Sequence, residues 1–103
     1  MLNSINWAES AYNDLTELLS YFQKQGEPEI GKILVARIHK ATGTLRYFPH
    51  AGRIGLLKGT RELVIPHIPY FLVYQVRQDV VDVLRVMHTS KLWTGDVGTS
   101  DAG

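Results

Sequence analysis

The sequence contains no cysteine among its 103 residues. This absence excludes a disulfide scaffold, a thiolate metal site and a cysteine nucleophile, and it is compatible with a reducing compartment. No apolar run reaches the roughly 18 residues that a membrane-spanning helix needs. The N-terminal residues also lack the basic-then-apolar pattern of a secretory signal. We therefore expect a cytoplasmic protein with no membrane contact.

The sequence also lacks the common motifs of cofactor chemistry. It has no glycine-rich phosphate loop, no His-Glu-x-x-His pair and no Gly-x-Ser-x-Gly elbow. No two histidines stand at the spacing of metal ligands; the four are His39, His50, His67 and His88. We expect neither a metal site nor a cofactor.

The composition is that of one folded domain, with 45% apolar and 20% charged residues. The last ten residues, 94–103, are small, polar or glycine apart from one valine, a pattern typical of a mobile terminus. We expect a single domain over residues 1–93 and a flexible tail over residues 94–103.

Charge is unevenly distributed, although the net charge is only +1. Residues 1–31 hold five acidic side chains and one lysine, whereas residues 32–61 hold seven basic side chains and no acidic one. Such a basic segment is either a solvated helix face or a contact surface for an acidic partner. Proteins that grip a nucleic-acid backbone usually carry a larger positive excess. We expect no sequence-specific nucleic-acid binding.

Apolar residues recur every three or four positions through the first half, which predicts two helices. A short strand over residues 5–7 precedes them. The first helix follows it and ends at Gly26, and the second begins at Pro28 and continues to Pro49. Helices joined by so short a turn should pack as an antiparallel hairpin.

The apolar period changes to two after Gly52, which predicts strands over residues 53–57, 60–68, 70–77 and 80–88. Pro66 interrupts the second of these and indicates an edge or a bulge. The last strand is apolar on both faces, as in a covered central strand. The predicted fold is α+β in the order β-α-α-β-β-β, with the helix hairpin on one face of a largely antiparallel sheet.

Basic residues on the predicted sheet form a candidate site; they are Arg61, His67, Arg85 and His88. Arginine and histidine together can cleave RNA at the 2′-hydroxyl, through proton transfer and charge stabilisation. In a regular strand, however, Arg85 and His88 point to opposite faces. Arginine on an apolar strand is more often an ion-pair member; the candidate acids are Glu62, Asp79 and Asp82. Likewise, Trp93 either covers the edge of the core or stacks on a base.

Four segments, in this order and spacing, resemble the ParE branch of the RelE/ParE toxin family. They are Gly52-Arg53, Gly59-Thr60-Arg61-Glu62-Leu63-Val64-Ile65, Pro69-Tyr70 with Val73-Tyr74, and Leu84-Arg85-Val86-Met87-His88. The resemblance extends to Trp7 and Trp93 and covers roughly residues 5–93. It implies the β-α-α-β-β-β fold of that family and the toxin of a type II toxin-antitoxin module.

The resemblance leaves two targets open. ParE-like members inhibit DNA gyrase and block replication, whereas RelE-like members cut messenger RNA on the ribosome with basic and acid-base residues. Arg61 and Arg85 match basic positions of the RelE-like set, and His88 lies where its acid-base group is expected. Thr89-Ser90 replaces a tyrosine of that pattern, and the net charge is low. We therefore favour gyrase inhibition by binding, with no catalytic residue and with Arg61, Arg85, His88 and Trp93 as candidate target contacts.

The resemblance also implies neutralisation by an antitoxin. A small domain with an exposed sheet edge and a basic segment suits a disordered acidic chain that folds on binding. The expected antitoxin contacts are Arg37, Lys40, Arg46 and Arg53. A non-toxic module that only corepresses transcription with its partner is a third interpretation, and growth arrest without the partner separates it from a toxin.

Overall fold

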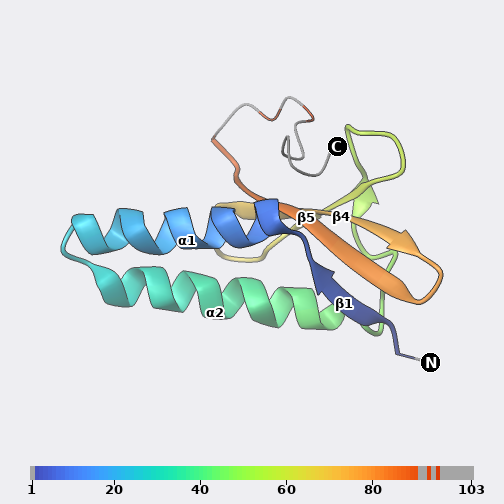
Figure 1. The fold of residues 1–103 in the computed structure, drawn as a ribbon, viewed down its shortest axis with the longest axis horizontal. Helices are drawn as coiled ribbons and strands as arrows, with labels where there is room; N and C mark the ends of the chain where they lie inside the picture. The colour runs from blue at the N-terminus through green and yellow to red at the C-terminus, as the bar shows by residue number, and fades with distance from the viewer. Residues whose placement is uncertain (1, 91–92, 94, 96–103) are drawn as a thin grey trace.

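The computed structural model describes residues 2–90, 93 and 95. A hairpin of two helices covers one face of a five-stranded sheet, and the turn that joins the helices projects past the strands (Figure 1). The expected tail over residues 94–103 lies outside the described residues except for Gly95. Neither helix in the described part of the chain combines the length and the apolar character that crossing a membrane requires.

The helix hairpin follows the sequence pattern closely at its closed end. α1 spans Glu9–Lys24, with an acid in its first turn and a base in its last, as the helix dipole favours. Gly26 has a φ of +74°, a left-handed conformation that reverses the chain at little cost. α2 spans Pro28–Thr44, with its proline in the first turn, where no N–H is needed. The predicted hairpin is confirmed.

The predicted end of the second helix at Pro49 is wrong, because α2 ends at Thr44. Successive tight backbone bonds, from Leu45 N to Thr42 O and from Arg46 N to Gly43 O, close its last turn. The sequence Thr-Gly-Thr supplies weak helix formers there, and the Thr44 hydroxyl donates to the Ala41 carbonyl. Phe48, expected on the apolar stripe, is therefore 68% exposed.

The sheet has the strand order β1-β5-β4-β3-β2. β1 (Ser4–Trp7) runs parallel to β5 (Val80–His88), and the other neighbours are antiparallel. The remaining strands are β2 (Arg53–Ile54), β3 (Arg61–Val64) and β4 (Tyr70–Arg77). The α+β fold with a largely antiparallel sheet is confirmed. All four strand segments predicted after the helices are present, one more than the order β-α-α-β-β-β counts.

The two strands that precede β4 are shorter than predicted. β2 stops at Ile54 because the chain turns soon after it: the Gly55 N–H still donates to Thr60 O, but the Leu56 N–H donates to the Glu62 carboxylate. β3 stops at Val64 because a turn containing Pro66 follows, in which His67 has a φ of +70°. β4 and β5 have the predicted bounds.

Both faces of the sheet are covered in part. The larger cluster lies between the helices and the sheet; its fully buried members include Ala11, Ile38, Leu72, Tyr74, Val81 and Val83. On the opposite face, Phe71, Val73 and Met87 pack with Trp93. β5 is thus an interior strand of the sheet and is covered on both faces, as its sequence predicts.

Tyr74 connects the sheet to the segment that follows α2. Its fully buried hydroxyl donates to Pro49 O at 2.8 Å and accepts from Gly52 N at 2.9 Å. A Cβ at Gly52 would lie 2.8 Å from that hydroxyl and 2.9 Å from Glu62 O. Glycine is therefore required at position 52 by close approach.

We expect Tyr74→Phe to lower the free energy of unfolding by about 2 kcal/mol, because a buried acceptor and a buried donor lose their partner. Urea unfolding measures the change. The matched control is Tyr47→Phe, at a side chain 63% exposed, which should change stability by less than about 0.5 kcal/mol. Equal effects of the two substitutions would contradict the role assigned to the hydroxyl.

A second polar cluster crosses three strands around Asp82. Its carboxylate accepts from Asn6 Nδ2 on β1 at 2.8 Å, Gln75 Nε2 on β4 at 3.1 Å, and Arg77 Nε at 2.6 Å. Burial disfavours the charged carboxylate, but these donors and the Arg77 charge outweigh it and hold the pKa of Asp82 below its ordinary value.

A carboxyl whose pKa is lower in the folded state stabilises the fold above its unfolded pKa, and this contribution is lost as the pH falls. We therefore expect Asp82→Asn to reduce the pH dependence of the unfolding free energy between about pH 5 and pH 2. Urea midpoints measured across this range test it. An Asp79→Asn control should keep the wild-type slope, since Asp79 is exposed; an unchanged slope in Asp82→Asn would refute the assignment.

Candidate functional site

α1 continues along the edge of β5 where β1 stops. β1 pairs with β5 only as far as Val83. Beyond it, Ala8 N donates to Val83 O at 2.9 Å, and Ser10 Oγ donates to Leu84 O at 2.7 Å. One turn later, the Asp14 carboxylate accepts from Val86 N at 2.8 Å. Side chains of a helix thus satisfy strand groups that a sixth strand would otherwise satisfy.

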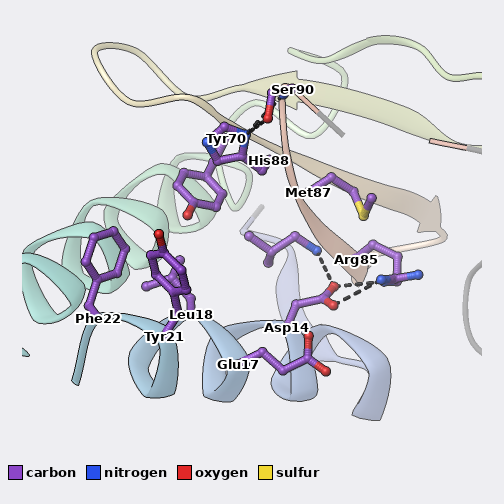
Figure 2. Close-up of a pocket in the computed structure, with 11 residues that line it drawn as sticks. Asp14, Glu17, Leu18, Tyr21, Phe22, Tyr70, Arg85, Met87, His88 and Ser90 are labelled. Carbon is purple, nitrogen blue, oxygen red and sulfur yellow. Dashed lines mark hydrogen bonds and ion pairs between the residues drawn. The ribbon is translucent and has the colours of Figure 1, made fainter. Parts of the chain in front are cut away.

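Asp14 also holds Arg85 in a two-bond ion pair. Arg85 Nε lies 2.8 Å from Asp14 Oδ2, and Nη2 lies 3.0 Å from Oδ1 (Figure 2). The two side chains are only 19% and 12% exposed. The guanidinium also lies 5.9 Å from the centre of the Trp93 ring. Arg85 is therefore neutralised and enclosed rather than presented to solvent.

A pocket of about 660 Å³ opens between α1 and the end of β5. Figure 2 shows the Asp14–Arg85 pair at one end and Tyr70 with His88 toward the other. The wall is largely apolar and aromatic, with two carboxylates; it consists of Asp14, Glu17, Leu18, Tyr21, Phe22, Tyr70, Arg85, Val86, Met87, His88 and Ser90.

His88 is fixed within this pocket by its neighbours. Its Nδ1 accepts from Ser90 N at 3.0 Å and lies 2.7 Å from Ser90 Oγ. Because a backbone N–H only donates, Nδ1 is the acceptor and the neutral ring carries its proton on Nε2. Tyr70 packs edge-on against the ring at 5.0 Å. Burial, and to a smaller extent Tyr21, raises the pKa of Tyr70, which keeps its phenol protonated at neutral pH.

The structure brings Arg85 and His88 to one pocket, but not Arg61 or His67. The pairing of β4 with β5 shifts register between Val73 and Tyr74, which face Arg85 and Val83. The irregularity thus comes before Arg85 on β5, and Arg85 and His88 still point to opposite sides of the strand. They share the pocket because Arg85 bonds to Asp14 on α1. Arg61 instead donates to Gly52 O at 2.8 Å and to His50 O at 3.3 Å. The predicted strand over residues 60–68 would have held both Arg61 and His67, but β3 ends at Val64, so His67 lies in the turn that follows it.

Two of the three acids predicted as partners for Arg61 and Arg85 pair with other arginines. Glu62 binds Arg53, at 2.9 Å, and Asp82 binds Arg77, at 2.6 Å. Arg85 pairs with Asp14, which lies 71 positions earlier in the chain. The sequence offered one signal for this pair, a carboxylate beside the apolar stripe of α1, but no local pattern links it to β5.

The remaining predicted contacts lie on different surfaces. Trp93 packs over Phe71, Val73 and Met87, as the core-edge interpretation expects. Arg37 and Lys40 line a second pocket, beside α2, of which Arg46 and Arg53 are not part. Among the described residues, no group of three or more His, Asp or Glu side chains is placed to hold a metal ion. The roles assigned to these residues stay predictions.

Comparison with known proteins identifies the family of this chain. The model for the ParE toxin of the type II toxin-antitoxin system parDE matches residues 5–93. The chain belongs to the ParE toxin family. This assignment agrees with the resemblance in the sequence and with its predicted fold.

The chain is also similar to individual proteins and to a solved structure. A Sinorhizobium fredii protein named Y4kP is 39% identical over 89 residues, which cover 86% of this chain and 91% of that protein. The toxin RelE2 of Caulobacter vibrioides is 28% identical over 86 residues, covering 84% of this chain and 94% of the relative. A chain of the chromosomal ParDE system of P. aeruginosa superimposes with a TM-score of 0.77 at 22% identity, over 86% of this chain and 98% of that one, and so shares the fold.

We expect Asp14→Ala in this ParE-family chain to lower the free energy of unfolding by about 3 kcal/mol, because it removes the two-bond carboxylate contact of the enclosed Arg85 charge and the acceptor of Val86 N. Chemical unfolding measures the loss. Glu17→Ala, at an exposed position in the same pocket, should cost less than about 0.5 kcal/mol. The double variant Asp14→Ala/Arg85→Met should recover part of the loss, and a strictly additive double variant would argue against a direct pair.

Proposed function

We propose that this ParE-family toxin blocks replication by binding DNA gyrase, and that a cognate antitoxin neutralises it. The observation that carries the choice of target is the Asp14–Arg85 pair inside the pocket that holds His88. RNA cleavage requires cations on the scissile phosphate. Among the described residues, Arg85 is the one arginine or lysine that lines this pocket, and the Asp14 carboxylate already binds its guanidinium.

The charge of the pocket supports the same proposal. Asp14 and Glu17 both line it, so a phosphate backbone entering it would meet two carboxylates. Its apolar wall, which includes Phe22, Tyr21 and Met87, instead suits the apolar and aromatic side chains of a protein target. Binding a protein needs no acid-base group, so His88 would act there as a contact and not as a catalyst.

The alternative is a ribosome-dependent ribonuclease, and one observation favours it. His88 is held in a single tautomer with Nε2 protonated, beside the Tyr70 phenol, in a pocket large enough for a base. That arrangement resembles the paired acid-base groups that RNA cleavage uses. Among the described residues that line the pocket, Arg85 is the one arginine or lysine, and Asp14 already binds it, so we rank this function second.

A supercoiling assay with purified gyrase tests the proposal. We expect inhibition that rises with the concentration of the purified toxin and is reversed by antitoxin. His88→Gln should retain inhibition within about fivefold, since a contact residue contributes about 1 kcal/mol or less at most positions of an interface.

Ribosome-bound messages incubated with the same two proteins provide the opposing test. A ribonuclease would cut them, and loss of its acid-base histidine would slow cleavage by about 10²- to 10⁴-fold. Cleavage by the wild type, abolished in His88→Gln, with gyrase unaffected, would overturn gyrase inhibition in favour of the alternative. A protein that neither inhibits gyrase nor arrests growth would instead match a corepressor.

A further inference from the structure

A second groove, of about 440 Å³, lies between the C-terminal half of α2 and the turn that joins β3 to β4. Its helical side carries Arg37, Lys40, Ala41 and Thr44, which fall on one face at spacings of three and four. The turn contributes Ile65, Pro66 and His67. The two sides come from segments more than twenty residues apart.

The charge of this groove is of one sign. Arg37 and Lys40 are exposed, and neither takes part in an ion pair within the described residues. His67 adds a third basic group, and no carboxylate lines the groove. The nearest acids along the chain are Glu29 and Glu62, and each is already paired, with Lys32 and with Arg53. The groove is thus positive without an internal counter-charge.

The turn holds His67 in an unusual backbone conformation. A φ of +70° costs a residue other than glycine about 1 kcal/mol or more. The ends of the turn are anchored, because Ile65 N donates to Tyr70 O at 3.0 Å and Pro69 O accepts from Thr89 N at 2.9 Å. An anchored turn therefore carries an imidazole at the groove in a conformation that glycine would adopt more readily.

The floor of the groove distinguishes a peptide from a nucleic acid. The half-buried Ala41 and the exposed Pro66 give the groove apolar surface beside its cations, and the buried Ile65 lines it next to Pro66. A phosphate backbone has no apolar group to cover such a floor, and the net charge of +1 is small for a protein that binds one. A peptide with carboxylates flanking an apolar side chain matches both the charge and the floor.

We propose that this groove binds an acidic, amphipathic segment of the antitoxin. Carboxylates of the segment pair with Arg37 and Lys40 and accept from His67, while one apolar side chain packs on Ala41 and Pro66. The proposal rests on neutralisation by an antitoxin and adds where that partner docks. It selects Arg37 and Lys40 from the four basic contacts predicted from sequence and adds His67.

The test measures the Kd of the full-length toxin for its cognate antitoxin by calorimetry. We expect Lys40→Glu to weaken binding about tenfold and Arg37→Glu/Lys40→Glu about a hundredfold. The matched control is Lys58→Glu, which makes the same charge change in an exposed turn outside the groove and should change the Kd less than twofold.

A second pair of variants separates binding from folding. His67→Gly removes the imidazole and relieves the left-handed backbone, so the toxin should stay as stable or become more stable while binding weakens about threefold. Gln78→Gly makes the matching change at the other non-glycine residue with a positive φ among the described residues. It should leave the Kd unchanged.

The proposal is overturned if Lys40→Glu and Lys58→Glu weaken binding equally, since the antitoxin would then respond only to net charge. It is also overturned if Lys40→Glu leaves the antitoxin Kd unchanged but abolishes binding of a single-stranded oligouridine probe, which would make the groove a nucleic-acid site. If the wild-type toxin fails to bind the antitoxin, the groove proposal and neutralisation fall together. The Kd for the antitoxin is measured without gyrase. The groove proposal can therefore still be tested if the toxin does not inhibit gyrase.

Discussion

The fold depends on how α1 seals the edge of β5. β1 covers only the first half of that central strand, and Asp14 supplies the acceptor that the backbone of Val86 needs further along. The same carboxylate binds Arg85 with two short bonds. A helix can replace a strand in this way only if a side chain reaches across to the unpaired N–H, since helical backbone groups are already bonded to one another. Asp14 therefore fixes the helix hairpin against the sheet.

This structural bond also determines the chemistry of the neighbouring pocket. Among the described residues, Arg85 is the one arginine or lysine that lines the pocket with His88, yet its charge is neutralised by the residue that closes the sheet. The pocket retains an apolar, aromatic wall with two carboxylates, which is a surface for protein side chains more than for phosphates.

A second surface, on α2 and the β3–β4 turn, carries basic side chains and lies apart from the pocket beside α1. Arg53, within the same basic segment, is paired with Glu62 across neighbouring strands, whereas Arg37 and Lys40 have no such partner within the described residues. Two surfaces of different character result: an aromatic pocket beside α1 and a cationic groove beside α2. A toxin with these two surfaces can meet its target and its antitoxin at separate places.

Local pattern in the sequence determined the helix hairpin, the bounds of β4 and β5, and the α+β fold, because helix periodicity, Gly26, Pro28 and strand alternation act over a few residues. The sequence also identified Arg85 and His88 as members of a candidate site, and both line the same pocket. Only the tertiary structure decided that Asp14 pairs with Arg85, that α2 ends at Thr44, and that His67 faces α2 from a turn. Those outcomes depend on contacts between distant segments and on side-chain bonds that end an element early, and neither leaves a periodic signal in the chain.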